Sequence, residues 1–249
     1  ALAAPLSTSM RLLAPRLQSL MRSANTLTKP ANPMLIMLGS GGHARVLQEV
    51  LSLAGFELHA FVAPTAEGSL LDTDHNDEPV RYYGDDSSLY ELDPQTHLLV
   101  NGLGSAGSLA LRSSVFEKFK KAGFNFLQIE AETAVVSPSA VLLEGVQVLN
   151  GAIINTDARI DDDTIVNTGA IVEHHNVIGS SCHISVGATL SGNVTVGNNT
   201  HIGAGATVIQ GISIGSNCII GAGAVVIRDV PDNHIAVGVP ATSRPIEVN

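Results

Sequence analysis

Three titratable residues stand side by side in a stretch that otherwise consists of aliphatic and small residues. The segment IVEHHNVIG, residues 171–179, contains Glu173, His174 and His175. A neutral imidazole has an unperturbed pKa near 6.5, so it can accept a proton at physiological pH and act as a general base. The same three residues could instead be polar groups at a turn or at a subunit contact. The pattern alone leaves both interpretations open.

A glycine-rich turn near the start of the folded region is a second candidate site. The segment GSGGHA, residues 39–44, matches G-x-G-x-x-A, which by itself is a weak dinucleotide fingerprint. A nicotinamide site should have Asp or Glu at the end of the second strand, where this chain has Ala63, so we do not expect NAD. The turn could instead hold a nucleotide sugar, because glycines let the ligand approach the backbone closely. The residues that would allow this approach are Gly39, Ser40, Gly41 and Gly42.

The segments around this turn alternate between strand and helix patterns. We expect strands at 34–38, 57–63, 97–101 and 124–129, and helices at 45–55 and 109–123. The polar segment 64–96 is expected to hold loops and a short strand. Alternating strands and helices predict a small parallel sheet of Rossmann type, with its ligand at the carboxyl ends of the strands.

A six-residue repeat replaces this pattern after residue 133. Divided into sixes from Ala134, the chain has Val, Ile or Leu at the third place of all sixteen hexads, from Val136 to Val226. This period predicts a parallel β-helix with three hexads in each coil. Positions three hexads apart then stack, so Gly192 should lie next to His174. Cys182 and Cys218 should lie two coils apart, about 9.6 Å at the normal strand spacing, which is too far for a disulfide.

The two patterns predict two domains and a leader. Residues 1–33 are cationic, and the chain has no Asp or Glu before Glu49. We expect this leader to be disordered or non-native, preceding a natural start at Met34, although a targeting segment or an amphipathic surface stretch would have a similar composition. Residues 34–132 should form a Rossmann-like nucleotide-sugar-binding domain, and residues 133–249 a β-helix with a C-terminal tail.

Composition excludes some classes of partner. With 45% hydrophobic residues among 249, the chain can bury a real core. Its formal charge of −10 gives no basic patch for nucleic acid. No apolar stretch is long enough to span a membrane, and the unpaired cysteines fit a reducing compartment, so we expect a cytoplasmic protein.

Four segments together resemble a known family. GSGGHARV, NTGAIVEHHNVIG, CHISVGATLSGNVTVG and the closing GVPA (238–241) are similar to bacterial acetyltransferases that modify nucleotide-linked amino sugars. These include the bacillosamine-pathway N-acetyltransferase and the related sialic acid O-acetyltransferases. The resemblance covers residues 34–246 and implies that the β-helix is left-handed, which the period does not determine.

The resemblance also implies roles for individual residues. His174 matches the general base, and the Gly192 backbone N–H matches the donor for the tetrahedral oxyanion. Acetyl-CoA, as co-substrate, would lie between two subunits of a homotrimer. The matching positions near it are His183, Ala204 and Ala222, and Asn167 matches a polar residue beside the base. His43 matches a position near the reacting end of the sugar, although a residue at the start of a helix could have no chemical role.

The chain departs from the family pattern at one position. The family usually has Glu or Asp directly after the base, where this chain has His175. Glu173 could take over that role, but its reach cannot be read from sequence. If no carboxylate supports the ring, we expect a weaker base.

We therefore expect transfer of acetyl from acetyl-CoA to the 4-amino group of a UDP-4-amino-4,6-dideoxy sugar, without a metal. O-acetylation of a sialic acid or a related sugar is the alternative within the enzyme class. A non-catalytic trimeric sugar-nucleotide binder is an alternative from another class. So is a zinc hydratase, in which His174, His183 and His201 would hold the metal.

Overall fold

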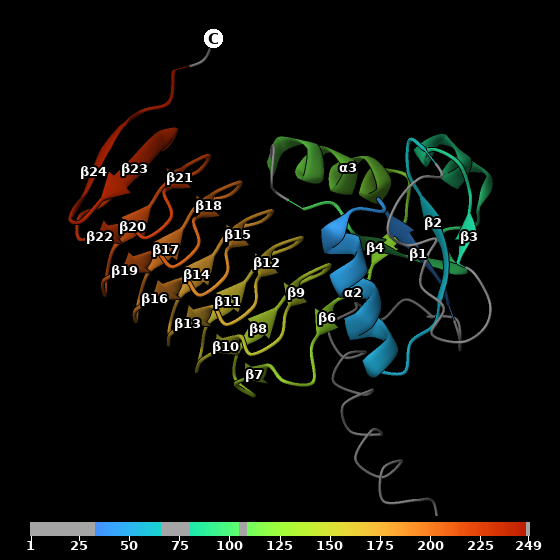
Figure 1. Cartoon of the computed structure of the whole chain (residues 1–249), viewed down its shortest axis with the longest axis horizontal. Helices are drawn as coiled ribbons and strands as arrows, with labels where there is room; N and C mark the ends of the chain where they lie inside the picture. Colours follow the sequence, from blue (N-terminus) through green and yellow to red (C-terminus); the bar gives the residue numbers. More distant parts are fainter. Residues whose placement is uncertain (1–32, 66–79, 105–108, 248–249) are drawn as a thin grey trace, which may run out of the picture.

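The computed structural model describes residues 33–65, 80–104 and 109–247. An α/β unit is followed along the chain by a long β-helix (Figure 1). Apart from Pro33, the leader lies outside the described residues, as does much of the polar segment expected at 64–96. None of the helices in the described ranges has the length and apolar character needed to cross a membrane.

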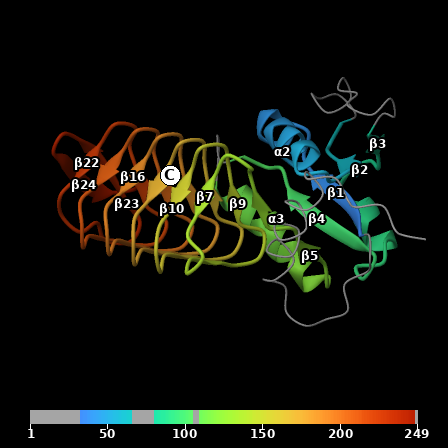
Figure 2. The ribbon, with the colours of Figure 1, turned by 90° about the horizontal axis from the view of Figure 1, so that it is seen from below.

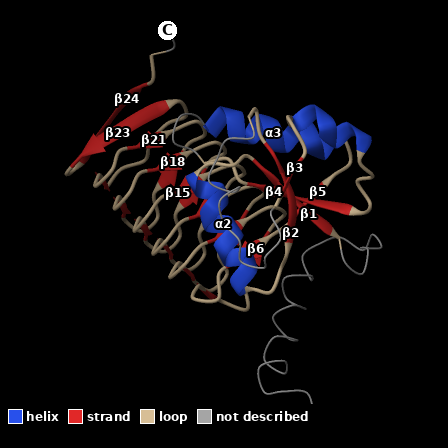
Figure 3. Ribbon diagram, turned by 45° about the vertical axis from the view of Figure 1, so that its right-hand side comes forward, coloured by secondary structure: helices blue, strands red, loops and turns tan. Residues whose placement is uncertain are grey.

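A five-stranded parallel sheet forms the centre of the N-terminal unit, with strand order β3-β2-β1-β4-β5. Its strands are β1 (Met34–Leu38), β2 (Leu58–Val62), β3 (Arg81–Tyr82), β4 (His97–Asn101) and β5 (Asn125–Phe126). Helices α2 (Gly42–Leu53) and α3 (Leu109–Lys121) lie beside this sheet (Figure 3). Helix α2 contributes Leu47 and Leu51 to one core cluster, whereas α3 contributes Phe116 and Phe119 to another. A 3₁₀ helix, η1 (Asp86–Glu91), precedes β4. Because both faces of the sheet are covered by core residues, the central strands β1 and β4 are continuous apolar runs.

The expected α/β pattern is confirmed, with differences at element ends. Strands β1 and β4 have the expected bounds, but α2 begins at Gly42 rather than at residue 45. The glycines hide this start because they carry no apolar side chain that would show the helical period. The strand expected at 124–129 is divided into β5 and β6 (Ile129–Glu130). Strand β6 pairs with a strand of the β-helix rather than with the N-terminal sheet.

The β-helix consists of three parallel sheets that run along its axis. They are named here by one strand each: the β9 sheet (order β24-β23-β21-β18-β15-β12-β9-β6), the β10 sheet (β22-β19-β16-β13-β10-β7) and the β11 sheet (β20-β17-β14-β11-β8). Successive strands belong to successive sheets, so three strands complete one coil, and Figure 2 shows these coils in a row. The remaining strands are β7 (Val135–Val136), β8 (Val141–Leu142), β9 (Gln147–Val148), β10 (Ile153–Ile154), β11 (Arg159–Ile160), β12 (Ile165–Val166), β13 (Ile171–Val172), β14 (Val177–Ile178), β15 (His183–Ile184), β16 (Thr189–Leu190), β17 (Thr195–Val196), β18 (His201–Ile202), β19 (Thr207–Val208), β20 (Ser213–Ile214), β21 (Ile219–Ile220) and β22 (Val225–Val226).

The hexad pattern produces this fold through one buried column on each sheet. Neighbouring coils pair positions that are three hexads apart, such as Val172 with Leu190, which confirms the expected coil length. The third residue of each hexad points inward, and from Leu142 onward these residues are at most 7% exposed. Small residues at the first place, among them Cys182 and Cys218, fill the same core, and both cysteines are free, as expected.

From Gly145 to Gly223, each hexad ends in a turn whose last residue has a left-handed backbone. The φ angle is +57° at Asp157, +58° at His175 and +59° at Asn193, and glycines take the same place in other hexads. Short polar residues and Gly tolerate this conformation best. The turns form the three edges of the prism, and a residue at one turn lies beside its counterpart in the next coil.

The two units are joined by a buried polar cluster. The guanidinium of Arg112, on α3, is fully buried and contacts Asp163 Oδ1 at 2.8 Å. The same guanidinium donates to the backbone oxygens of Asn101 and Leu103 at 3.0 and 2.6 Å. Burial raises the pKa of the Asp163 carboxyl to about 6, although Arg112 acts to lower it. This cluster fixes α3 against the first coils.

The β-helix ends in an antiparallel hairpin at the end distant from the N-terminal unit (Figure 1). Strand β23 (His234–Gly238) continues the β9 sheet by pairing with β21, and β24 (Ala241–Pro245) pairs with β23. The GVPA segment forms the connection between these two strands. The hairpin therefore covers the last coil.

Candidate active site

The imidazole of His174 lies over Gly192 in the next coil. A Cβ atom placed on Gly192 would lie 2.5 Å from His174 Nε2 and 3.1 Å from Nδ1, so no side chain fits there unless the ring moves. The φ angle of Gly192 is not positive, so the glycine is needed for the close approach and not for the backbone conformation. Within the described parts of the chain, no group accepts a hydrogen bond from the Gly192 N–H. The stacking expected from the spacing of three hexads is confirmed.

A second imidazole and a carboxylate extend from His174 along the same edge. The Nδ1 atoms of His174 and His175 lie 3.0 Å apart, and the two rings are nearly perpendicular. On its other side, His175 Nε2 lies 3.7 Å from Oδ2 of Asp157 in the preceding coil. The side chains of His175 and Asp157 are 60% and 54% exposed. Sequence reasoning missed Asp157, although its place three hexads before His175 is the signal that locates it.

Glu173 does not bind the imidazole of His174. Its Oε2 atom accepts from Asn155 Nδ2 at 3.1 Å and from the backbone N–H of His174 at 3.3 Å. The carboxylate therefore binds the backbone of its own turn. Glu173 does not replace the carboxylate that the family has directly after the base.

His43 belongs to a different group of polar residues, where the N-terminal unit meets the β9 sheet. Its Nε2 donates to Oε1 of Gln147 at 2.8 Å, while Gln147 Nε2 donates to the backbone oxygen of Asn101 at 2.8 Å. Burial, together with the charge of Arg112, lowers the pKa of His43 to about 4. His43 is therefore neutral at physiological pH, with its proton on Nε2.

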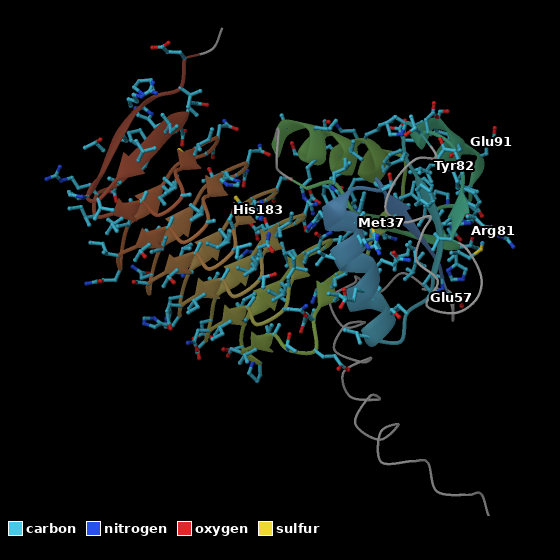
Figure 4. All side chains as sticks on the ribbon, in the orientation of Figure 1. Met37, Glu57, Arg81, Tyr82, Glu91 and His183 are labelled. Atoms are coloured by element: carbon cyan, nitrogen blue, oxygen red, sulfur yellow. The ribbon has the colours of Figure 1, made fainter. Side chains whose placement is uncertain are left out.

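His183 lies on the outer face of the β9 sheet, on the side of the N-terminal unit (Figure 4). Its Nε2 atom lies 2.9 Å from Asn167 Nδ2, which has only protons to offer, so the ring nitrogen accepts. The rings of His183 and His201 meet edge to face at 5.2 Å. Burial, with smaller effects of His201 and His43, lowers the pKa of His183 to about 3. His183 is therefore an uncharged ring at neutral pH.

Within one chain, these two groups face in different directions. His174 follows β13 and precedes β14, so it lies at the edge between the β10 and β11 sheets. In a prism of three sheets, that edge is opposite the β9 sheet, which carries Gln147 and His183. Asn167 accordingly contacts His183 and is not beside His174 of its own chain. A single chain does not assemble all the expected site residues in one place.

The two alanines expected near acetyl-CoA lie at a third position. Ala204 and Ala222 are exposed turn residues that follow β18 and β21, at the edge between the β9 and β10 sheets. Because they are three hexads apart, they stack and present only methyl groups to solvent. This edge therefore has a strip without long side chains.

A cavity of about 330 Å³ lies at the carboxyl ends of β1, β2 and β4. Its lining includes Leu38, Gly39, Val62, Ala63 and Leu103, together with Asp85 and Asp86. Gly39 has φ +91°, a conformation that favours glycine. Of the glycine turn predicted to bind the nucleotide sugar, Gly39 lines this cavity, whereas Ser40, Gly41 and Gly42 are not part of its lining; neither acid was predicted from the sequence. The signal for Asp85 was its place before Ser87, whose backbone N–H it accepts at 2.9 Å as a helix cap.

No metal centre is formed by the described residues. They contain no group of three or more His, Cys, Asp or Glu side chains that could hold an ion. Of the three histidines considered for zinc, His183 and His201 are adjacent, but His174 lies at the opposite edge of the β-helix. These three histidines are therefore too far apart to bind one metal ion.

Comparison with known proteins identifies the repeats and two groups of similar structures. Residues 193–228 match the family model "Bacterial transferase hexapeptide (six repeats)". PerB from Caulobacter crescentus, a perosamine N-acetyltransferase solved with CoA and GDP-perosamine, is 37% identical, with a TM-score of 0.75 over 88% of this chain and 100% of PerB. The acetyltransferase domain of PglB from Neisseria gonorrhoeae FA1090 is 32% identical, with a TM-score of 0.75 over 86% of this chain and all of that domain. It has also been solved with acetyl coenzyme A. No curated protein sequence matches the chain.

Proposed function

The chain belongs to the family of nucleotide-sugar N-acetyltransferases built on hexapeptide repeats, and from this premise we propose its substrates and mechanism. It transfers acetyl from acetyl-CoA to the amine of a nucleotide-linked 4-amino-4,6-dideoxy sugar. The observation that carries the proposal is the imidazole of His174 lying against the free backbone N–H of Gly192. These two groups are what direct attack of an amine on a thioester requires.

His174 acts as the general base. Its Nε2 takes a proton from the sugar amine as the nitrogen bonds to the thioester carbonyl carbon. Because general-base catalysis needs a group that is unprotonated at working pH, a histidine suits this step. The imidazolium then gives the proton to the CoA sulfur as the carbon–sulfur bond breaks. The nitrogen–carbon bond replaces the carbon–sulfur bond, and no charge is left on the enzyme.

Gly192 stabilises the tetrahedral intermediate. Its N–H has no partner among the described groups, so it can donate to the oxyanion without breaking another hydrogen bond. A donor placed in advance costs no reorganisation during the reaction, and losing one such donor typically slows turnover about 100-fold to 1,000-fold.

The cavity at the carboxyl ends of β1, β2 and β4 holds the nucleotide. This location is where open α/β sheets bind ligands, and Gly39 of the glycine turn lines it. We place the phosphates at the rest of this turn, before the start of α2, because a helix N-terminus favours anions. The resemblance in sequence favours UDP, whereas PerB was solved with GDP-perosamine. His43 lies at the second position of α2, where the N-terminal unit meets the β9 sheet, and we place the reacting end of the sugar there.

A homotrimer completes the active site. His174 and the pair His43 and His183 lie on opposite sides of one β-helix, so the base must come from one subunit and the sugar-binding unit from its neighbour. Acetyl-CoA then lies in the groove between them, along the alanine strip at Ala204 and Ala222. Acetyl-CoA is a cytoplasmic metabolite, so the proposal places the enzyme in the cytoplasm.

The substrate proposal is tested by measuring free CoA. The purified protein is incubated with acetyl-CoA and a panel of UDP- and GDP-linked amino sugars, with the matching hydroxy sugars as controls. We expect thiol release with a 4-amino sugar and none with its 4-hydroxy counterpart. Release with hydroxy sugars or sialic acids would show O-acetylation instead, and release with none would contradict the proposed acceptor.

The shared site is tested by mixing two inactive variants. His174→Ala removes the base, and Gly41→Asp places a carboxylate where the phosphates should bind. The fold should tolerate the second change, because a Cβ atom at Gly41 meets nothing within 4 Å. If the site lies between subunits, co-refolded mixtures regain activity, since some interfaces then carry both intact halves. No recovery in mixed oligomers would place the whole site in one chain.

A further inference from the structure

The edge that carries His174 holds a chain of three side chains, Asp157, His175 and His174. We infer that Asp157 is a positioning residue for the base, acting through His175, and thereby replaces the carboxylate that the family has directly after the base. The inference rests on the proposed role of His174. Asp157 belongs to the preceding coil, and the resemblance to the family assigns it no role.

The hydrogen placement that we assign to this chain starts from the carboxylate of Asp157. We assign the proton of His175 to Nε2, because a lone pair there would face Oδ2 of Asp157, which lies 3.7 Å away, within ion-pair range but beyond a direct hydrogen bond. The Nδ1 atom of His175 is then an acceptor. Because it lies 3.0 Å from Nδ1 of His174, the latter must donate. His174 Nε2 is left with its lone pair, as a general base requires.

The same chain supports the charge that develops during the reaction. When His174 Nε2 takes the amine proton, the positive charge spreads over a ring whose Nδ1–H already donates to His175. The Asp157 carboxylate compensates that charge through His175, from which it is separated by an ion-pair distance. Hydrogen bonds of this kind are often long in the free enzyme and shorten in the reacting complex.

Other charged groups around His174 do not provide this support. Glu173, on the same turn, is occupied by Asn155 and by the backbone N–H of His174. The next coil presents Ser191, Gly192 and Asn193, none of which titrates. Among the described residues of the three stacked turns, Asp157 is therefore the acid that faces the pair of rings.

The turn geometry provides substitutions that preserve the fold. Asp157 has φ +57°, a conformation that Asn and Gly both tolerate. Asp157→Asn removes the charge with little change in shape, and Asp157→Gly removes the whole side chain. Glu173→Gln removes a charge from the same edge without touching the rings. Glu57→Gln is the control for net charge, because Glu57 is exposed on the N-terminal unit, distant from the β-helix (Figure 4).

The experiment measures kcat and KM against pH for the wild type and these variants. Both Asp157 variants should lower kcat by about twofold to fivefold, the effect expected of a partly exposed ion pair, with KM for acetyl-CoA unchanged. Glu173→Gln should have a smaller effect, and Glu57→Gln none. In a His175→Asn background, Asp157→Asn should cause no further loss.

Two kinetic outcomes would overturn the inference. One is a wild-type kcat at every pH for both Asp157 variants. The other is a larger loss for Glu173→Gln than for Asp157→Asn, which would make Glu173 the supporting carboxylate.

A measurement without turnover separates this inference from the proposed function. Nitrogen NMR of the histidines, assigned with His174→Asn and His175→Asn, reports which ring nitrogen carries the proton. We expect the proton on Nδ1 of His174 and on Nε2 of His175, and a mixed population in Asp157→Gly. The opposite tautomers in the wild type would refute the relay even if the enzyme is active. The expected tautomers in an inactive protein would uphold the geometry and refute only the substrate.

Discussion

Replacing Gly192 by alanine should inactivate the enzyme without unfolding it. The new Cβ would lie 2.5 Å from His174 Nε2 and 3.1 Å from Nδ1, so the imidazole must move by about an ångström to restore ordinary contacts. The backbone accepts the change, because the φ angle of Gly192 is not positive. A Gly→Ala change at such a position alters the free energy of unfolding by only about 1 kcal/mol, partly through the unfolded chain.

The loss of activity follows from that displacement. Moving a catalytic group by about 1 Å can cost about 100-fold in rate, and the methyl group also covers the N–H that should face the oxyanion. We therefore expect kcat to fall by at least about 100-fold, with KM for acetyl-CoA changing much less. The assay is CoA release at saturating substrates, with circular dichroism and size-exclusion chromatography to verify the fold.

Two further variants make the interpretation specific. Ser191→Ala, at the preceding residue, alters the same turn without approaching the ring and should remain active. In a His174→Ala background, Gly192→Ala should cost far less, because the ring it displaces is gone. A Gly192→Ala enzyme that keeps kcat within threefold of the wild type would refute the reasoning, since the ring would then not need its position over the glycine.

The remaining predictions concern stability. Asp163→Asn should lower the free energy of unfolding by about 3–5 kcal/mol, because it leaves the fully buried Arg112 guanidinium without its counter-charge. Urea unfolding measures this loss. A loss below about 1 kcal/mol would contradict the role of the ion pair. Burial lowers the pKa of His43 to about 4 and that of His183 to about 3, so at these two residues the unfolded chain binds more protons than the folded one below pH 6.5. Their contribution to stability should therefore fall as the pH decreases from 6.5 toward 4, by about 3 kcal/mol at most for His43, while Asp163, whose pKa is raised to about 6, acts in the opposite direction. A smaller acid sensitivity is expected for His43→Gln, measured by thermal unfolding at several pH values, and an unchanged pH slope would show that His43 is protonated in the fold.

The β-helix could be predicted from sequence because its backbone repeats. A third-place aliphatic residue in every hexad fixes which side chains point inward, and the ladder between coils then fixes which residues stack. The neighbours His174 and Gly192 follow from that register alone. So does the pair Asp157 and His175, although a carboxylate in another coil is not evident from the residues next to the base along the chain.

Other features depend on packing that no repeat encodes. The direction of Glu173 is decided by Asn155, whose amide holds the carboxylate at the turn. The contact of Arg112 with Asp163 arises where α3 meets the first coils, and the sequence gives no period that relates these two residues. Asp85 reaches the cavity because it caps η1, a short element without a hydrophobic pattern. In each case the partner is chosen by tertiary structure.

The identity of the base is the central claim, and one comparison tests it most directly. Wild type and His174→Ala are incubated with acetyl-CoA and the nucleotide-linked 4-amino sugar that gives the fastest CoA release, and mass spectrometry follows acetylation of the sugar. Since His174 is exposed and contributes nothing to the core, the variant should keep the wild-type oligomer and thermal stability. We predict acetylated amine from the wild type and a rate at least about 100-fold lower from His174→Ala. Equal rates from the two proteins would contradict the account.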